Sequence, residues 1–320
     1  MASSKSHCRF GLALFGGLAL LSLLAPNADT QQQAPGFAVE RLYQSAPGGG
    51  WLVMDDLNIS GGLGGVLSIS SGYAHNPLVI TGSDGQQHLA LVTQQAFVDL
   101  GGAVTYHRFR GYINLPTPIL GTGTSGTLGP YQFTAPAVSL GTTPDTLSDS
   151  RLGFDVRLVG EPGNLLRLGA GAQLIIPSGN RSDYVSDGRY EGMFRLLAAG
   201  DAGLFTYAGQ LGVHVRPLNE APIPDSPNGN EFLYGISGGR RFTVPDGWTV
   251  IAGPEIYGET AFQSFFSGET GTEALLTGRL EKTGTGRNVR MKLGVGHALV
   301  QNFGAPQWRI VFGVEVFGHK

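Results

Sequence analysis

The feature that most constrains this chain is a repeated alternation between apolar residues and polar or small residues. In residues 308–317, for example, Trp308 and Ile310 share one face of an extended chain, whereas Arg309 and Glu315 share the other. Side chains of a strand point alternately to opposite faces of a sheet, so this pattern predicts a sheet with one apolar and one polar face. The pattern recurs along most of the chain, and helical periodicity is almost absent.

Twelve segments carry the alternation. They are residues 63–73, 94–106, 108–115, 151–159, 165–176, 193–199, 204–216, 231–242, 248–259, 272–281, 288–299 and 308–317. Their connections alternate between short and long, and the long ones are residues 76–93, 116–150, 177–192, 217–230 and 260–271. The connection at 300–306 is the short exception among them.

An even strand number with alternating loop lengths is typical of bacterial membrane barrels, whose short turns face the periplasm. The sequence therefore predicts an all-β fold, a transmembrane antiparallel up-and-down β-barrel of about 12 strands. The barrel is expected over residues 60–320, in the outer membrane of a Gram-negative bacterium, with both chain ends on the periplasmic side.

A soluble two-sheet sandwich also alternates and is the main alternative. A sandwich exposes its second face to bulk water, whereas glycines mixed with charges of both signs also suit an enclosed lumen. The loop rhythm and an apparent export signal favour the barrel. No apolar stretch beyond that signal approaches the roughly 20 residues that a membrane helix needs.

The N-terminus is typical of a signal peptide, because Lys5 and Arg9 precede an apolar run that ends at Ala25. We expect a cleaved signal over residues 1–28 and a periplasmic N-terminal segment over residues 29–59. Within that segment, two aspartates are interpreted as periplasmic turn residues, namely Asp55 and Asp56.

Composition argues against several other functions. The chain has 21 basic and 24 acidic residues, a net charge of −3, so no large basic surface for nucleic acid is expected. The one cysteine, Cys8, lies in the signal. The seven histidines are scattered without ligand spacing, and glycine clusters lack a phosphate-binding lysine. We therefore expect no cofactor and no metal site.

Four short motifs resemble a known group of barrels. They are Phe37–Arg41, Tyr73–Leu78, Ile175–Gly179 and Leu196–Asp201. Together they resemble the barrel region of myxobacterial and related OmpA-family or transporter-like outer-membrane proteins, and they are similar to barrels grouped with phenol meta-pathway transporters. The resemblance runs from Phe37 to Phe317 and implies the fold and the membrane, but no catalytic residue. Many such relatives continue into a peptidoglycan-binding domain, and that anchoring role is not carried over.

Charged residues on the polar phase are the candidate lumen-lining set. They are Asp99, Arg108, Arg110, Asp155, Arg157, Arg167, Arg195, His214, Arg216, Glu255, Arg279, Arg290, Lys292, Arg309 and Glu315. One interpretation is a polar interior whose charges select among solutes. The other is a set of ion pairs that fills the barrel and leaves no open path. The sequence leaves both open, because strand order alone does not say which charges meet.

Catalysis has weaker support. Some outer-membrane barrels hydrolyse lipids, and His75, Asn76 and the serines of 68–71 offer suitable residue types. His-Asn-Pro is equally typical of a loop start, and no nucleophile motif accompanies it. We therefore expect no catalytic residue and no enzyme.

The leading hypothesis is a passive channel or transporter for small solutes, with the loop at Pro116–Ser150 as a gate. A lumen completely filled by side chains would count against it. The alternatives are a non-conducting structural or surface-interaction barrel and, less favoured, a lipid hydrolase. Expected partners are outer-membrane lipid and a small solute that the sequence does not identify, and it leaves the oligomeric state open.

Overall fold

The computed structural model describes residues 31–59, 61–81, 87–140, 147–218, 229–266, 270–282, 284, 288–302 and 304–319. The expected signal peptide at 1–28 lies outside these residues. No helix in the described part of the chain is both long and apolar enough to cross a membrane.

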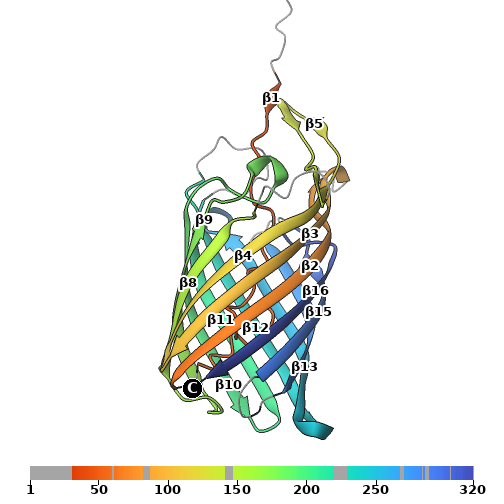
Figure 1. Ribbon diagram of the computed structural model, residues 1–320. Coiled ribbons are helices and arrows are strands. Elements are labelled where there is room, and N and C mark those ends of the chain that lie inside the picture. Colours follow the sequence, from red (N-terminus) through yellow and green to blue (C-terminus); the bar gives the residue numbers. More distant parts are fainter. Residues whose placement is uncertain are drawn as a thin grey trace, which may run out of the picture.

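Twelve antiparallel strands form a closed barrel (Figure 1). They are β2 (Leu63–Thr81), β3 (Gln87–Tyr106), β4 (Phe109–Thr122), β8 (Ser150–Val159), β9 (Arg167–Ile176), β10 (Glu191–Ala202), β11 (Phe205–Val215), β12 (Glu231–Val244), β13 (Trp248–Ala261), β14 (Gly271–Lys282), β15 (Asn288–Val300) and β16 (Trp308–His319). Each pairs with the next along the chain, and β16 pairs with β2 to close the ring. The predicted twelve-stranded up-and-down barrel is confirmed.

The barrel has an apolar exterior and a charged interior. In β8, Leu152 and Phe154 are each 51% exposed, whereas Asp155, the residue after Phe154, is fully buried. In β16, Ile310 is 42% exposed beside an Arg309 that is 1% exposed. A soluble protein hides its apolar side chains, so this inverted distribution requires lipid outside the wall. The protein is an outer-membrane β-barrel.

The two ends of the barrel differ. At the turn end, the β3–β4 connection is only His107–Arg108, and a short 3-10 turn, η3 (Pro245–Gly247), joins β12 to β13. The opposite, loop end carries the remaining short elements. They are β1 (Gln32–Gln33), β5 (Gly126–Leu128), β6 (Tyr131–Phe133), β7 (Val138–Ser139), η2 (Arg181–Asp183) and η4 (Phe262–Ser264). Figure 1 shows β1 and β5 above the loop end and the C-terminal end of the chain at the turn end.

Residues 76–93 were predicted as a long loop, and this prediction was wrong. β2 and β3 continue as a hairpin past the barrel wall, with Leu78 opposite Val92 and Ile80 opposite Leu89. Leu78 and Val92 are buried in an apolar cluster that also contains Phe37 and others. Packing outside the wall therefore extends the strands beyond the point where the alternation weakens.

Residues 34–59, which we call the plug, run through the inside of the barrel from the loop end to the turn end (Figure 1). Trp51, Met54 and Ile59 are at most 1% exposed, and the plug packs against inward-facing Ile251 and Val311. The segment expected as periplasmic is residues 29–59. Its described part, residues 31–59, starts at the loop end and lies largely within the barrel. Its apolar side chains are removed from water there, which favours the interior over solution.

Candidate functional site in the barrel interior

The lower plug, residues 45–59, folds locally around two carboxylates and a glycine turn. The Asp55 carboxylate accepts a hydrogen bond from the Leu57 amide at 2.8 Å, and Asp56 accepts from the Asn58 amide at 3.1 Å. Short polar side chains favour turns of this kind. At Gly50 an added Cβ would lie 1.9 Å from the Arg279 guanidinium and 2.0 Å from the Asp56 carboxylate, so any other residue would displace this ion pair. The aspartates interpreted as periplasmic turn residues do form turns, but these turns lie inside the barrel.

Glu255 on β13 holds the plug backbone through three hydrogen bonds. Its carboxylate accepts hydrogen bonds from the amides of Leu52, Val53 and Met54 at 2.9, 2.9 and 3.0 Å. The Thr277 hydroxyl donates a fourth at 2.7 Å. Glu255 is fully buried, so its charge depends entirely on these donors.

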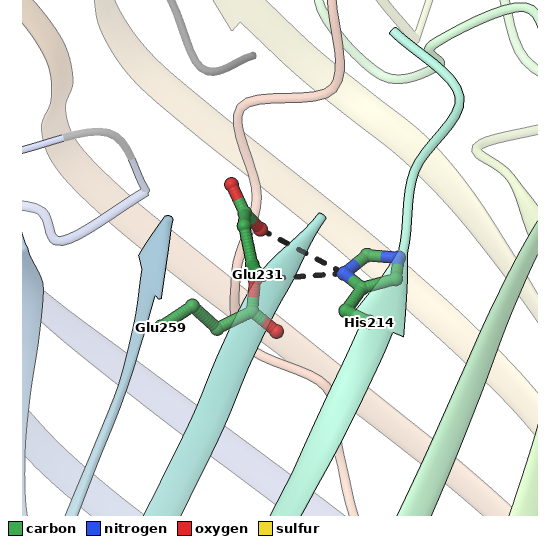
Figure 2. Close-up of side chains that lie close together, drawn as sticks. All are labelled: His214, Glu231 and Glu259. Carbon is green, nitrogen blue, oxygen red and sulfur yellow. Dashed lines mark ion pairs between the residues drawn. The ribbon is translucent and has the colours of Figure 1, made fainter. Parts of the chain in front are cut away.

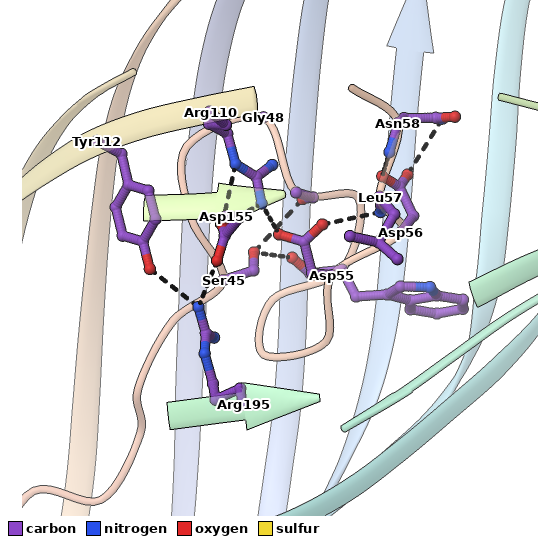
Figure 3. Close-up of polar contacts among 12 residues, drawn as sticks. Ser45, Gly48, Asp55, Asp56, Leu57, Asn58, Arg110, Tyr112, Asp155 and Arg195 are labelled. Atoms are coloured by element: carbon purple, nitrogen blue, oxygen red, sulfur yellow. Dashed lines mark hydrogen bonds and ion pairs between the residues drawn. The ribbon is translucent and has the colours of Figure 1, made fainter. Parts of the chain in front are cut away.

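Asp55 joins the plug to a charged network on the wall (Figure 3). The Arg110 guanidinium bridges Asp55 and Asp155, and its nearest nitrogen is 2.6 Å from the Asp155 carboxylate. On the other side, Arg195 lies 3.3 Å from Asp155 and donates to the Tyr112 hydroxyl at 2.9 Å. Every charged group of this network therefore has an oppositely charged neighbour.

Further wall cations bind the plug backbone. Lys292 donates to the carbonyls of Gly49 and Trp51 at 3.3 and 3.2 Å, and it forms an ion pair with Glu315 at 2.7 Å. Arg290 binds the Gly48 carbonyl at 3.1 Å and the same Glu315 at 2.9 Å. The plug is thus held by both its backbone and its side chains.

Fourteen of the fifteen candidate lumen residues are buried inside the closed wall. They are Asp99, Arg110, Asp155, Arg157, Arg167, Arg195, His214, Arg216, Glu255, Arg279, Arg290, Lys292, Arg309 and Glu315. Arg108 differs, because it lies exposed in the turn between β3 and β4. In place of an open polar lumen, the structure has charges paired with one another and with the plug.

Several interior charges were missed by the sequence analysis. They are Glu40, Arg41, Arg151, Glu191, Glu231, Glu259 and Glu273, in addition to the two plug aspartates. Four of these glutamates lie at or near the loop-end tips of strands, where the alternation ends and gives little signal. Arg151 is on the polar phase of β8 and could have been included.

The remaining part of the plug, residues 34–44, meets a cluster of charges near the loop end. Arg41 lies 3.6 Å from Glu231 and 3.4 Å from Glu259, and Arg216 lies 2.8 Å from Glu231. Arg216 also binds Asp187, a residue of the loop before β10. Burial opposes ionisation of that carboxyl, but the Arg216 guanidinium outweighs it and lowers the pKa of Asp187 to about 2. Asp187 in turn accepts a hydrogen bond from the Ala38 amide at 2.7 Å, which ties the loop to the plug.

A pocket opens at the loop end beside the plug, where the pairing of β4 with β8 stops. The register between these strands ends at Asn114, and Pro116 and Pro118 follow it in β4. Proline has no backbone N–H to donate to a neighbouring strand, which accounts for the break. The pocket has about 710 Å³ of unfilled space including its open mouth, and both apolar Phe97 and charged Arg151 line it.

The residues considered for lipid hydrolysis do not form a catalytic constellation. His75 stacks on Trp308 with ring centroids 5.5 Å apart, and its ring contacts the Asn76 amide. Ser71 lies four residues away on the same strand, a separation of roughly 13 Å. Among the described residues, no serine hydroxyl is hydrogen-bonded to His75.

No protein-family model and no curated protein matches this chain. Among solved structures, an outer-membrane channel from Pseudomonas putida F1 is similar over 81% of this chain and 96% of its own, with a TM-score of 0.53 and 14% identity. The NanC porin covers 79% of this chain and 99% of its own, with a TM-score of 0.45 and 7% identity. LpxR from Salmonella typhimurium covers 80% of this chain and 100% of its own, with a TM-score of 0.38 and 12% identity. These likenesses bear on the fold alone, and this chain is similar to solved outer-membrane barrels.

Proposed function

We propose that the protein is a passive channel for small solutes and that the plug, rather than the loop at Pro116–Ser150, is its gate. The observation that carries this proposal is the pairing of the wall charges. Arg110 binds Asp55 of the plug but also Asp155 of the wall, and Lys292 binds plug carbonyls but also Glu315. Departure of the plug would leave these cations paired and the lumen polar, which is what conduction of solutes in water requires.

The closed state is the resting state under this proposal. Trp51, Leu52 and Met54 are at most 2% exposed and would enter an aqueous lumen if the plug moved. Glu255 would lose three of its four hydrogen bonds. Both changes oppose opening, so we expect rare openings in the intact chain and frequent ones when these contacts are removed.

The loop-end pocket suggests the class of solute. It combines apolar walls, including Phe97 and Ile175, with the polar Gln95 and Arg151. A small aromatic compound with one polar group would fit such a lining. The resemblance to barrels grouped with phenol meta-pathway transporters agrees with this class.

The test is single-channel conductance of refolded protein in planar bilayers, with the plug either removed or fixed. One variant lacks residues 34–59. A second, Leu52→Cys with Gly294→Cys, places two thiols where Leu52 Cγ, the position that a cysteine sulfur would take, lies 3.8 Å from a Cβ added at Gly294. The sequence contains only Cys8 besides, so protein refolded without the signal has no competing thiol.

We expect large, stable steps from the deletion variant, rare steps from the intact chain, and closure of the double-cysteine variant that is reversed by reductant. Leu52→Cys alone controls for the loss of the leucine side chain. If the deletion variant folds as a barrel and stays silent, the channel proposal is wrong. That outcome favours the alternative of a non-conducting structural barrel, in which the plug is a permanent part of the interior.

A further inference from the structure

We propose that His214, Glu231 and Glu259 bind a divalent transition-metal cation inside the barrel near its loop end. This inference goes beyond the proposed channel function and does not depend on it. The three residues come from the consecutive strands β11, β12 and β13 (Figure 2). His214 and Glu231 are register partners, and one potential ligand atom from each of the three residues lies within 4.8 Å of the others. Strand pairing thus brings together residues that lie far apart in the sequence.

The atoms that face one another lack hydrogen-bond partners. These atoms are His214 Nδ1, Glu231 Oε2 and both carboxylate oxygens of Glu259, and each is buried. His214 Nδ1 lies 3.8 Å from Glu231 Oε2 and 3.6 Å from Glu259 Oε2, which exceeds the length of an N–H···O hydrogen bond. Buried polar atoms are rarely left unpaired, so the arrangement points to a missing partner between them.

The other ring nitrogen of His214 is held as in many metal sites. His214 Nε2 lies 2.7 Å from Glu191 Oε2, and the side chain is fully buried. In the neutral tautomer whose proton lies on Nε2 and is shared with Glu191, the lone pair of Nδ1 is directed toward Glu231 and Glu259. Metal-binding histidines are usually oriented by such a carboxylate on the far side of the ring. The Tyr43 ring packs edge-on against the imidazole at 5.4 Å and restricts it further.

The charge of the cluster also favours a divalent cation. Four carboxylates, those of Asp187, Glu191, Glu231 and Glu259, surround two guanidiniums, those of Arg41 and Arg216. With His214 neutral, two negative charges are in excess. Protonation of His214 would compensate one of them, whereas a divalent cation compensates both.

The ligand types select the class of metal. One imidazole nitrogen with carboxylate oxygens suits Zn²⁺ and neighbouring first-row metals, while Ca²⁺ and Mg²⁺ favour all-oxygen sites. We therefore expect Zn²⁺ to bind more tightly than Ca²⁺ or Mg²⁺.

The test is the metal content of the refolded full chain. The protein is incubated with zinc chloride, freed of excess by gel filtration and analysed by mass spectrometry of the metal. We expect about one Zn²⁺ per chain, together with a zinc-dependent rise in the unfolding temperature. Glu259→Gln, which keeps the side-chain shape, should abolish both, and Glu191→Gln should weaken zinc binding by 10- to 100-fold.

Glu315→Gln is the matched control, because Glu315 is also a buried carboxylate but pairs with Arg290 and Lys292 and has no histidine beside it. It should bind zinc as the unaltered chain does. Cobalt provides a second readout on the unaltered chain, since bound Co²⁺ shows visible absorption that reports nitrogen and oxygen ligands. Failure of the unaltered chain to retain zinc, or retention by Glu259→Gln equal to that of the unaltered chain, would overturn the proposal.

Discussion

Two regions of the barrel interior both contain buried carboxylates, but the carboxylates differ in how completely they are hydrogen-bonded. Between mid-barrel and the turn end, Glu255 and Asp55 are buried carboxylates whose charges are engaged by amides or a guanidinium. At the loop end, Glu231 and Glu259 are also buried and lie near Arg41, but Glu231 Oε2 and both Glu259 oxygens accept no hydrogen bond. The comparison teaches that burial of charge does not by itself reveal its role. A satisfied carboxylate holds structure together, whereas an unsatisfied one is free to take a ligand.

The sharpest test of this contrast is Glu255→Ala in the middle of β13. It leaves three buried plug amides unpaired, so we expect a loss of roughly 3–5 kcal/mol in unfolding free energy and frequent channel openings. Denaturant unfolding in detergent and bilayer conductance measure the two effects. Glu161→Ala removes a carboxylate that is 71% exposed and is the control. Equal stability of the two variants would show that Glu255 does not anchor the plug.

A smaller effect is expected from Asp55→Asn. The amide keeps an acceptor for the Leu57 N–H but removes the charge that faces Arg110, while Asp155 still partners that guanidinium. We expect a loss of about 2 kcal/mol. The same unfolding assay applies, with the exposed turn residue in Asp246→Asn as the control. A loss as large as that of Glu255→Ala would mean that Asp155 cannot hold Arg110 alone.

At the loop end, removal of a carboxylate charge should stabilise the protein rather than destabilise it. In the presence of a chelator, Glu259→Gln removes one of the excess negative charges, so we expect a gain in unfolding free energy of up to about 1 kcal/mol. With zinc present, the same variant should be less stable than the unaltered chain. Comparing the two unfolding curves measures both. Destabilisation in chelator as well would place Glu259 with the structural carboxylates and erase the contrast.

The smallest effect is expected from Arg108→Ala. Arg108 was grouped with the lumen charges but lies exposed in the β3–β4 turn. Its removal should leave conductance and ion selectivity of the plug-deleted barrel unchanged. Arg167→Ala provides the comparison. Arg167 is buried in the interior, where it donates to the Asp56 carbonyl at 3.0 Å and pairs with Asp201 at 2.6 Å. Its removal should change conductance and ion selectivity.

The sequence predicts the wall well because a strand records its two faces in every second residue. Leu152, Asp155 and Arg309 take the sides that their alternation indicates. The plug sequence has no such alternation. Trp51, Leu52, Val53 and Met54 are all buried in succession, since a segment surrounded by the wall has no exposed face to alternate with.

The loop-end cluster was unpredictable for another reason. His214, Glu231 and Glu259 meet only through the register of three strands, and metal-site recognition from sequence relies on short fixed spacings. Register depends on the packing of every neighbouring strand, which one sequence does not display. The turn-end network was unpredictable because Asp55 precedes β2 and Arg110 follows β3, so the two residues meet only when the plug lies inside the barrel.

The passage of the plug through the barrel also constrains the order of assembly. The plug precedes β2 in the chain, yet its other end is attached at the loop end, where β1 pairs with β6. The seam between β2 and β16 joins the first and last strands of the barrel, so it can form only after the whole chain has been synthesised. A ring that closed while empty would then have to admit the β1 end through its own lumen. The simpler route is that the plug serves as a core around which the sheet curls, so that loss of Glu255 would slow insertion into the membrane as well as weaken the finished barrel.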